Sequence, residues 1–355
     1  MDNPRCIGRI DPEDLRRFTK EVFVKVGMKP EHADIVADHL LLADLRGVDS
    51  HGALLRVPIY LKGIREKDIN PAPNIRIVKE DGISVLVDGD RGLGIIAASI
   101  LTDKVIEKAR RNSVALGGVI NIRHAGMLAY YAIKLVRNRL IGLIFANSSR
   151  TVAPWGGSKP FLGTNPICIA FPMNDEYIIL DMATSAASRG KLSALASRGE
   201  KIPEGWGLDK FGRPTTDPRE ILDGGVLLPF GGYKGYGLSL AADILAATVT
   251  GGVNSYLLDP GWWIQGGVFM IAFRADIFRS YEEYLVDLKK LVENLKKIPP
   301  AQGFSEVLYP GEIELRNFRE RLAKGIPVTS ERWSKLLEVA RELGIEMPKL
   351  LSNEC

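Results

Sequence analysis

Short apolar runs spaced along the middle of the chain constrain the fold most. They occupy residues 115–122, 141–147, 167–171, 177–181 and 268–273. Runs of this length between turn residues are typical of buried strands. Helical spacing of apolar residues occurs between them, at 95–111, 128–136 and 238–249. The alternation predicts a mixed fold of helices and strands, and 355 residues predict two domains or one large bilobed unit.

Polar residues follow several of these strands at the point where each one ends. They are His124, Asn147 and Ser148, Asn165, and Asp181. Strand ends that gather polar groups are where cofactor and ligand clefts form in such folds. The sequence therefore predicts a small-molecule site at this edge of the sheet.

His124 lies at a strand-to-helix turn, with Gly126 two residues later for tight backbone geometry. A histidine held there by rigid elements can move a proton near neutral pH. Taken alone, the stretch equally fits a polar turn residue that caps the following helix. His32 and His39, both within an expected helix from Pro30, are interpreted as structural or solvated.

Ser50 and His51 form a second candidate site, at the predicted start of a helix. Backbone N–H groups at a helix start favour anions, and the flanking Arg46 and Arg56 can grip a carboxylate with two hydrogen bonds. The Ser-His pair is not a hydrolase dyad, because no GxSxG elbow is present. A capping box with a solvated histidine is the structural alternative.

Composition excludes several classes of protein. The net charge of +4 is spread without blocks of like sign, which predicts neither nucleic-acid nor membrane binding. No apolar run reaches about 18 residues, and residues 1–14 lack an apolar leader, so a cytoplasmic protein is expected. Four histidines and three scattered cysteines predict no metal site. Scarce glutamine with abundant Lys and Glu hints at a thermophilic source.

Two glycine-rich segments fit neither standard phosphate-binding motif. Residues 88–94 contain GxxGxG rather than GxGxxG, and residues 231–237 read Gly-Gly-Tyr-Lys-Gly-Tyr-Gly rather than a P-loop. In the second segment, glycines allow close approach of a ligand and Lys234 can offer its charge to a cofactor.

Six motifs, in this order, carry a family resemblance over nearly the whole chain. They are Asp44-Leu-Arg-Gly-Val-Asp-Ser-His-Gly52, His124-Ala-Gly126 with Tyr130-Tyr131, Gly163-Thr-Asn-Pro166, Asp181-Met-Ala-Thr184, Lys234-Gly-Tyr-Gly237 and Tyr309-Pro-Gly-Glu312. Together they resemble the malate/L-lactate dehydrogenase family of the non-Rossmann type, which includes sulfolactate and ureidoglycolate dehydrogenases and ketimine reductases.

The resemblance implies an α/β (α+β) fold. An NAD(P)-binding domain on a large mixed sheet of non-Rossmann topology would span 86–299, and residues 1–85 with 300–355 would form a helical substrate and dimerisation domain. It further implies a homodimer that transfers hydride between nicotinamide and a 2-hydroxy/2-oxo acid, malate or a lactate-like acid foremost.

The resemblance also implies roles for individual residues. His124 matches the acid/base histidine, and Ser50 and His51 match a pair that contacts substrate and assists proton transfer. Arg56, then Arg46, is the candidate for the substrate carboxylate. Positions that match cofactor contacts are Ser148, Asp181, Met182, Ala183 and Lys234, together with Gly311 and Glu312 in a late loop.

Two positions depart from the family pattern. The arginine expected four residues after His51 is replaced by Leu55, and Arg56 follows one residue later. One residue on a helix turns a side chain by about 100°, so the sequence leaves open whether Arg56 reaches the substrate. A frequent Gly-His-Phe-Phe strand entry here reads Gly266-Gly-Val-Phe269 and lacks the histidine.

Cofactor and substrate choice stay open between stated alternatives. Glu312 and Glu314 favour NAD if their loop borders the adenosine ribose, whereas Arg316 keeps NADP open. The same site could reduce the C=N bond of a cyclic ketimine acid. A scaffold that binds the cofactor without turnover is the third hypothesis.

Overall fold

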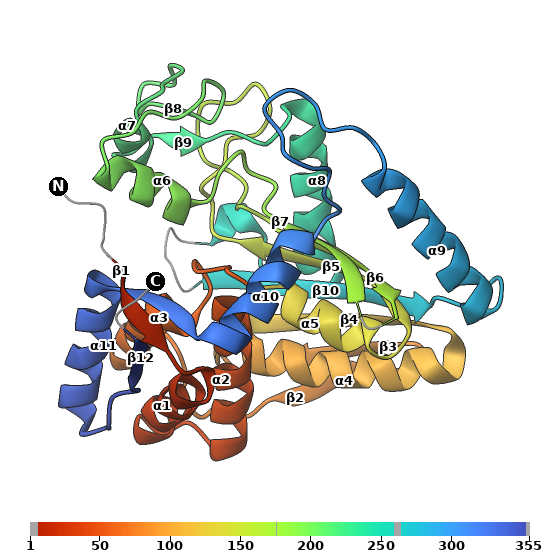
Figure 1. Cartoon of the computed structure of the whole chain (residues 1–355), viewed down its shortest axis with the longest axis horizontal. Coiled ribbons are helices and arrows are strands. Elements are labelled where there is room, and N and C mark those ends of the chain that lie inside the picture. The colour runs from red at the N-terminus through yellow and green to blue at the C-terminus, as the bar shows by residue number, and fades with distance from the viewer. Residues whose placement is uncertain (1–5, 175, 259–263, 353–355) are drawn as a thin grey trace.

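The computed structural model describes residues 6–174, 176–258 and 264–352, and Figure 1 shows their arrangement. A seven-stranded sheet forms the centre, in the order β2-β3-β4-β10-β5-β6-β7. Its strands are β2 (Arg76–Glu80), β3 (Ser84–Asp88), β4 (Val114–Arg123), β10 (Ile264–Arg274), β5 (Leu140–Ser148), β6 (Ile167–Met173) and β7 (Glu176–Met182). β3 and β4 pair in parallel, whereas the other neighbours are antiparallel. The expected large mixed sheet is confirmed.

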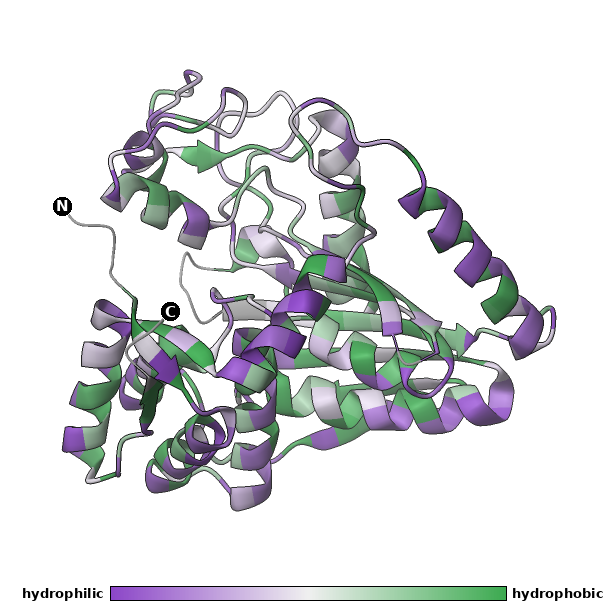
Figure 2. Ribbon diagram, in the orientation of Figure 1, coloured by the Kyte–Doolittle hydropathy of each residue, from purple (hydrophilic) through white to green (hydrophobic). Residues whose placement is uncertain are grey.

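Helices cover both faces of this sheet. Helices α4 (Gly94–Asn112) and α5 (Ala129–Val136) lie on one face, and α8 (Tyr233–Asp243) with the π-helical turn η1 (Ile244–Val249) lies on the other. Two successive glycines of β4 show this: a side chain at Gly117 would meet α4, and one at Gly118 would meet Thr250 after η1. Figure 2 shows the central strands coloured mainly as hydrophobic, as strands buried on both faces require.

Segments from the two ends of the chain build a second layer beside the sheet (Figure 1). It contains α1 (Pro12–Lys25), α2 (Pro30–Leu45), α3 (Ala53–Arg65), α10 (Glu312–Lys324) and α11 (Ser330–Leu343). A small sheet, β11 (Ile326–Thr329), β1 (Cys6–Ile10) and β12 (Leu350–Ser352), completes it. Its hydrophobic core continues into the first turn of α4 through Leu93, Ile95 and Ile96. The core of the terminal layer is therefore packed directly against the helices of the central sheet.

A third, smaller unit packs around seven buried residues, namely Val152, Leu162, Ala187, Leu192, Ile202, Ile221 and Leu227. It comprises α6 (Arg189–Ser197), α7 (Pro218–Leu222) and the two-stranded sheet of β8 (Gly207–Leu208) and β9 (Val226–Leu227). The short helix η2 (Ser255–Leu257) lies after η1. Most of this unit is loop, so its core is small relative to its surface.

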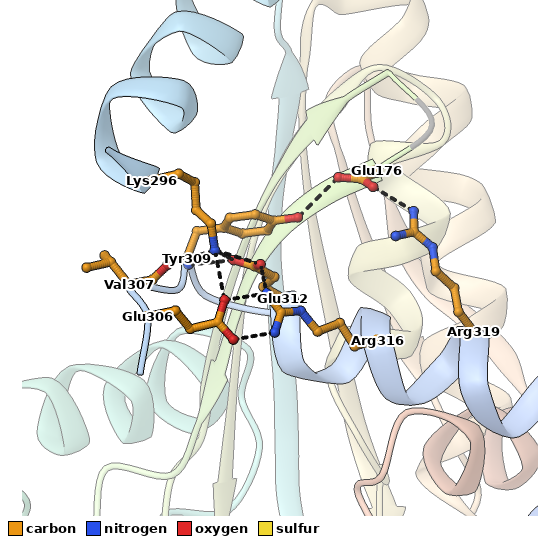
Figure 3. A network of polar contacts seen from close by, with 8 residues as sticks. All are labelled: Glu176, Lys296, Glu306, Val307, Tyr309, Glu312, Arg316 and Arg319. Carbon is orange, nitrogen blue, oxygen red and sulfur yellow. Dashed lines mark hydrogen bonds and ion pairs between the residues drawn. The ribbon is translucent and has the colours of Figure 1, made fainter. Parts of the chain in front are cut away.

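Ion pairs fix the segment that leads from α9 (Tyr281–Lys296) back to the terminal layer (Figure 3). The Lys296 ammonium lies 2.8 Å from the Glu312 carboxylate, and Arg316 pairs with both Glu306 and Glu312. Glu312 Oε2 also accepts the Tyr309 N–H at 3.2 Å. The network anchors the first turn of α10, and Glu312 already has two cationic partners.

The division of the chain at residues 85 and 300 stays a proposal. β2 and β3 both pair within the seven-stranded sheet, and the division at residue 85 separates β2 from that sheet and cuts through β3. Among the described residues, no helix has the length and apolar character needed to cross a membrane.

Candidate active site

A cavity of about 800 Å³ lies where the three units meet. One wall is formed by the turn between α2 and α3 and by α3 itself, with His124 from the end of β4. Helix α6 forms the opposite wall, while the end of β5 and the start of α11 complete the lining. Five residues selected from the sequence line it together: Ser50, His51, Arg56, His124 and Ser148.

His124 is fixed by contacts to one of its two ring nitrogens. The Tyr60 hydroxyl lies 2.6 Å from Nδ1, and the Gly126 backbone nitrogen lies 3.2 Å from the same atom. The ring is 8% exposed and lies 5.3 Å from the His51 ring, centroid to centroid, in a stacked arrangement. These contacts orient the imidazole and leave Nε2 for a ligand in the cavity.

His39 supports this turn from behind and is buried, as its structural interpretation expects. Its Nε2 accepts the Met127 N–H at 2.8 Å. Gly126 has φ of +71°, and a Cβ there would overlap the His39 ring, so both backbone conformation and space require glycine. Burial lowers the pKa of His39 to about 3, so it stays neutral and can accept this hydrogen bond.

The Ser50-His51 turn is held by a buried carboxylate. Ser50 Oγ lies 2.9 Å from His51 Nδ1. Gly52, rather than Ser50 or Asp49, is the N-cap of α3, and Asp44 accepts the Leu54 N–H at 3.3 Å. A Cβ at Gly52 would overlap the Asp44 carboxylate. The structural alternative, a capping box, is therefore absent from this turn, where Asp44 accepts a backbone N–H of α3 instead.

Asp44 is a carboxylic acid buried in the protein interior, where charged side chains are rare. Its side chain is fully buried, and burial, followed by the nearby Asp49, raises its pKa to about 7. Arg321 from α10 bonds the Asp44 carbonyl at 2.6 Å and the Asp49 carboxylate at 2.8 Å. The C-terminal segment thus ties down the turn that carries His51.

Arg56 faces the cavity in spite of the apparent insertion before it. It is 8% exposed, and its Nε donates to the Ser50 carbonyl at 2.7 Å. Among the described residues no carboxylate pairs with it. Burial, and then the positive charge of Arg56, hold the pKa of His51 and of His124 well below the usual value. The charge of Arg56 therefore favours neutral histidines, and its guanidinium can receive a substrate carboxylate.

Arg46, the second carboxylate candidate, does not line the cavity. It is fully buried, and its guanidinium carbon lies 5.7 Å from the centre of the Tyr177 ring. Its Nη1 is 3.5 Å from the Tyr177 hydroxyl. The structure brings only one of the two candidate arginines to the histidines.

The ends of β5 and β6 present hydroxyl groups to the cavity. The Thr164 N–H donates to Ser148 Oγ at 3.1 Å, and the Ser148 N–H donates to Asn165 Oδ1 at the same distance. Thr151 also lines the cavity, and its Oγ1 is buried without a partner among the described residues. An unsatisfied hydroxyl in a cavity fits a polar ligand group, as the ribose or carboxamide of a nicotinamide cofactor would supply.

The other proposed cofactor residues lie outside this cavity. Asp181 Oδ2 accepts the Ala129 N–H at 2.8 Å, at the start of α5. Met182 and Ala183 are half-buried where β7 ends, and Lys234 is exposed at the start of α8. Gly311, with φ of +89°, is the N-cap of α10 and packs against Ile179, beside the ion-paired Glu312. Their cofactor roles stay predictions.

Sequence reasoning missed Tyr60, Asp44 and Arg189. Tyr60 lies four residues after Arg56, and this spacing places two side chains on one face of a helix. Its position near the site was therefore predictable from the sequence. Asp44 is recognisable only from its burial against Gly52, and Arg189 only from its place in the cavity wall. Among the described residues, no group of three or more His, Cys, Asp or Glu side chains could hold a metal ion.

The chain is similar to known proteins over nearly its whole length. A sequence model of the malate/L-lactate dehydrogenase family matches residues 10–337. The malate/(S)-sulfolactate dehydrogenase of Methanothermus fervidus is 38% identical over 95% of this chain and 99% of its own. The ureidoglycolate dehydrogenase (NAD(+)) of Escherichia coli K12 is 33% identical, over 94% and 96%. The solved delta1-piperideine-2-carboxylate reductase from Pseudomonas syringae superposes with a TM-score of 0.86 at 31% identity, over 94% and 99%.

Proposed function

Because the chain belongs to the malate/L-lactate dehydrogenase family, we propose that it transfers hydride between a nicotinamide cofactor and a small 2-hydroxy/2-oxo acid. Malate and its oxo acid are the first candidates. One observation carries the proposal: an oriented histidine, His124, lies in the same cavity as a buried arginine that has no carboxylate partner among the described residues. That pair matches the proton and the carboxylate that such a substrate brings.

The residues divide the chemistry between them. The bound cofactor supplies the hydride acceptor or donor. Arg56 binds the substrate carboxylate and so places the adjacent carbon and its oxygen beside His124. His124 accepts the hydroxyl proton at Nε2 during oxidation and returns it to the oxygen during reduction. This step uses the tautomer that carries its proton on Nδ1 and donates it to the Tyr60 hydroxyl oxygen. Its lowered pKa keeps the ring neutral, and therefore able to accept a proton, throughout the neutral range.

Tyr60, His51 and Ser50 act on His124 or on the substrate next to it. Burial raises the pKa of Tyr60 to about 12, so its hydroxyl stays protonated and holds the imidazole in place. His51 is stacked on His124 and bonded to Ser50, which supports a role in substrate contact and proton transfer. Because its pKa is lowered, His51 stays neutral, and a neutral ring beside His124 does not oppose the positive charge that His124 gains when it takes the proton.

The cofactor is proposed to be NAD, with NADP as the alternative. Ser148, Thr151 and Thr164 line the cavity, and their hydroxyl groups could bind a polar group of the cofactor at the ends of the strands. The pairing of Arg316 with Glu306 and Glu312 supports NAD, because a paired arginine is a weaker site for a 2′-phosphate. Asp181, Met182, Ala183, Lys234, Gly311 and Glu312 complete the proposed cofactor contacts.

We also propose a homodimer, as the family resemblance implies. An apolar stripe on α8 and η1 supports it: Leu238 is 43% exposed, Ile244 44% and Val249 59%. Gly237 and Ala241, between these side chains, would let a second helix approach closely. Light scattering should give twice the chain mass. Ile244→Glu should halve it, whereas Val286→Glu on the exposed helix α9 should leave it unchanged.

The second candidate reaction is reduction of a cyclic ketimine acid. The likeness to a solved delta1-piperideine-2-carboxylate reductase favours it. A C=N carbon beside a carboxylate presents the same two groups to Arg56 and His124. Activity with a cyclic ketimine acid above that with any open-chain 2-oxo acid would replace the leading proposal.

Nicotinamide absorbance with NADH and NADPH tests the proposal directly. The panel should hold oxaloacetate, sulfopyruvate, pyruvate and a cyclic ketimine acid. Turnover with an open-chain oxo acid, preferring NADH, is the expected result. Tight cofactor binding without turnover of any panel member would identify a scaffold that lacks the chemistry.

A further inference from the structure

Some of the cationic side chains that line the cavity form ion pairs with Asp or Glu side chains of the protein, and others do not. Arg198 pairs with Glu200, Lys335 lies 2.6 Å from Glu331, and Arg332 lies 3.8 Å from Asp49. Arg56 and Arg189 line the same cavity, and neither forms an ion pair with any described carboxylate. Two cations are therefore available to anionic groups of a ligand.

These two arginines lie on opposite walls of the cavity. Arg56 is on α3 in the terminal layer, whereas Arg189 is the first residue of α6 in the small unit, and Figure 1 shows these helices on opposite sides. Ser188 caps α6 by accepting the Lys191 N–H at 3.1 Å, and Leu192 is fully buried one turn later. The helix is thus anchored by one side while the exposed Arg189 faces the cavity.

The position of each arginine relative to His124 separates their roles. Arg56 is almost fully buried in the wall that holds His124, and its charge acts on that histidine. It is therefore the cation beside the reacting carbon. Arg189 lines the opposite wall, on α6, so a substrate held by Arg56 beside His124 would turn its other end towards Arg189.

We propose that Arg189 is a specificity-determining residue that binds the second anionic group, a carboxylate or sulfonate, of a dianionic 2-oxo acid. The inference rests on the proposed function and names its substrate class. A guanidinium binds either group with two parallel hydrogen bonds. A monoanionic acid lacks this contact, so the site discriminates against it by losing the pairing.

Arg189→Met tests this role, with Arg219→Met, on α7 of the same small unit and outside the cavity lining, as the matched control. For oxaloacetate, kcat/KM should fall about 10- to 100-fold in Arg189→Met, mainly through KM. For 2-oxobutanoate, of similar length but with one charge, it should change less than about twofold. The KM for NADH should stay constant, Arg219→Met should resemble the wild type, and Arg189→Lys should recover part of the loss.

Other outcomes would overturn the inference. An equal loss for both acids would make Arg189 a structural or general catalytic contributor. A raised KM for NADH with an unchanged KM for oxaloacetate would assign it to a cofactor phosphate. Calorimetry with malonate, a dianion that does not react, gives a readout independent of turnover. If the wild type turns over neither acid, the proposed function fails, and malonate binding that Arg189→Met abolishes would still support the anion site. Equal malonate affinity in both proteins, or none in either, would contradict it.

Discussion

The two walls of the cavity are built in different ways. On the histidine wall, His124 and Arg56 are each 8% exposed and Asp44 is fully buried. Its groups are held by Tyr60, by His39 through the backbone after Gly126, and by Arg321. On the α6 wall, the side chains that face the cavity are mostly exposed, and among the described residues of α6 only Leu192 is fully buried.

The cores behind the walls differ as much as the walls. The histidine wall rests on the core of the terminal layer, which holds Leu54 and Tyr60 and extends into α4. The α6 wall rests on seven buried residues surrounded by loops. Sections with few buried apolar contacts open at lower free energy than the rest of a protein.

The difference suggests a division of labour. Proton transfer requires fixed geometry, since a displacement of about 1 Å can cost about 100-fold in rate. Recognition of the distal end of a substrate tolerates, and can benefit from, a wall that adjusts.

His124→Asn should give the largest loss. The amide can still meet Tyr60 and the Gly126 N–H near the place of Nδ1, but nothing replaces Nε2. We expect kcat to fall by about 10²- to 10⁴-fold, with NADH affinity, followed by fluorescence, unchanged. Full turnover in this variant would remove His124 from the acid/base role.

Matched core truncations compare the walls themselves. Leu54 and Leu192 are both almost fully buried, one behind each wall. Leu54→Ala should lower the free energy of unfolding by about 2–5 kcal/mol, measured with urea. Leu192→Ala should lower the global value less, and should raise hydrogen exchange selectively within residues 187–230. Equal global losses, with no local exchange, would show that the two walls unfold as one unit.

Arg56→Met should separate the two arginines. Loss of the cation next to the reacting carbon should lower kcat/KM about 10- to 100-fold for oxaloacetate and 2-oxobutanoate alike. The charge of Arg56 lowers the pKa of His124, so its removal should move the acid limb of the pH–rate profile to higher pH. An unshifted limb would indicate that burial alone sets this pKa.

The sequence was sufficient to predict the mixed sheet and most of its elements. Long helices such as 95–111 and strands such as 115–122 follow from local periodicity, and the structure has α4 and β4 there. The strand order was out of reach, because β10 lies between β4 and β5 although it is more than 100 residues from either. The same limit hid the contact of α6 with the cavity.

For the site, the four predicted residues that the cavity brings together come from two short segments of the sequence, and their roles stay predictions. Ser50, His51 and Arg56 belong to one turn and helix, and His124 to another turn, and all four line one cavity. The supports of these residues were not predictable. The Asp44 carboxylate lies against the backbone of Gly52, where any side chain would collide with it. His39 accepts the backbone N–H of Met127, which is far from it in the sequence. Residue type alone does not reveal either contact.

His39→Gln probes that support through pH. Burial gives folded His39 a pKa of about 3 against an ordinary 6.5, so between these values the unfolded chain holds one more proton. The free energy of unfolding therefore loses about 1.4 kcal/mol per pH unit as pH falls below 6.5. Glutamine can still accept the Met127 N–H but does not titrate. The free energy of unfolding, measured with urea between pH 7 and 4.5, should therefore fall less steeply with falling pH in the variant, by that amount per pH unit.

Asp44 contributes to the same pH range with the opposite sign. Its raised pKa, about 7, adds stability as pH falls through that value towards 3.8, since the folded state then holds the extra proton. This contribution is present in the wild type and in His39→Gln alike, so it cancels in the difference between them. Parallel curves would mean that His39 takes up its proton without global unfolding. The histidine wall would then open locally, and the contrast drawn between the two walls would fail.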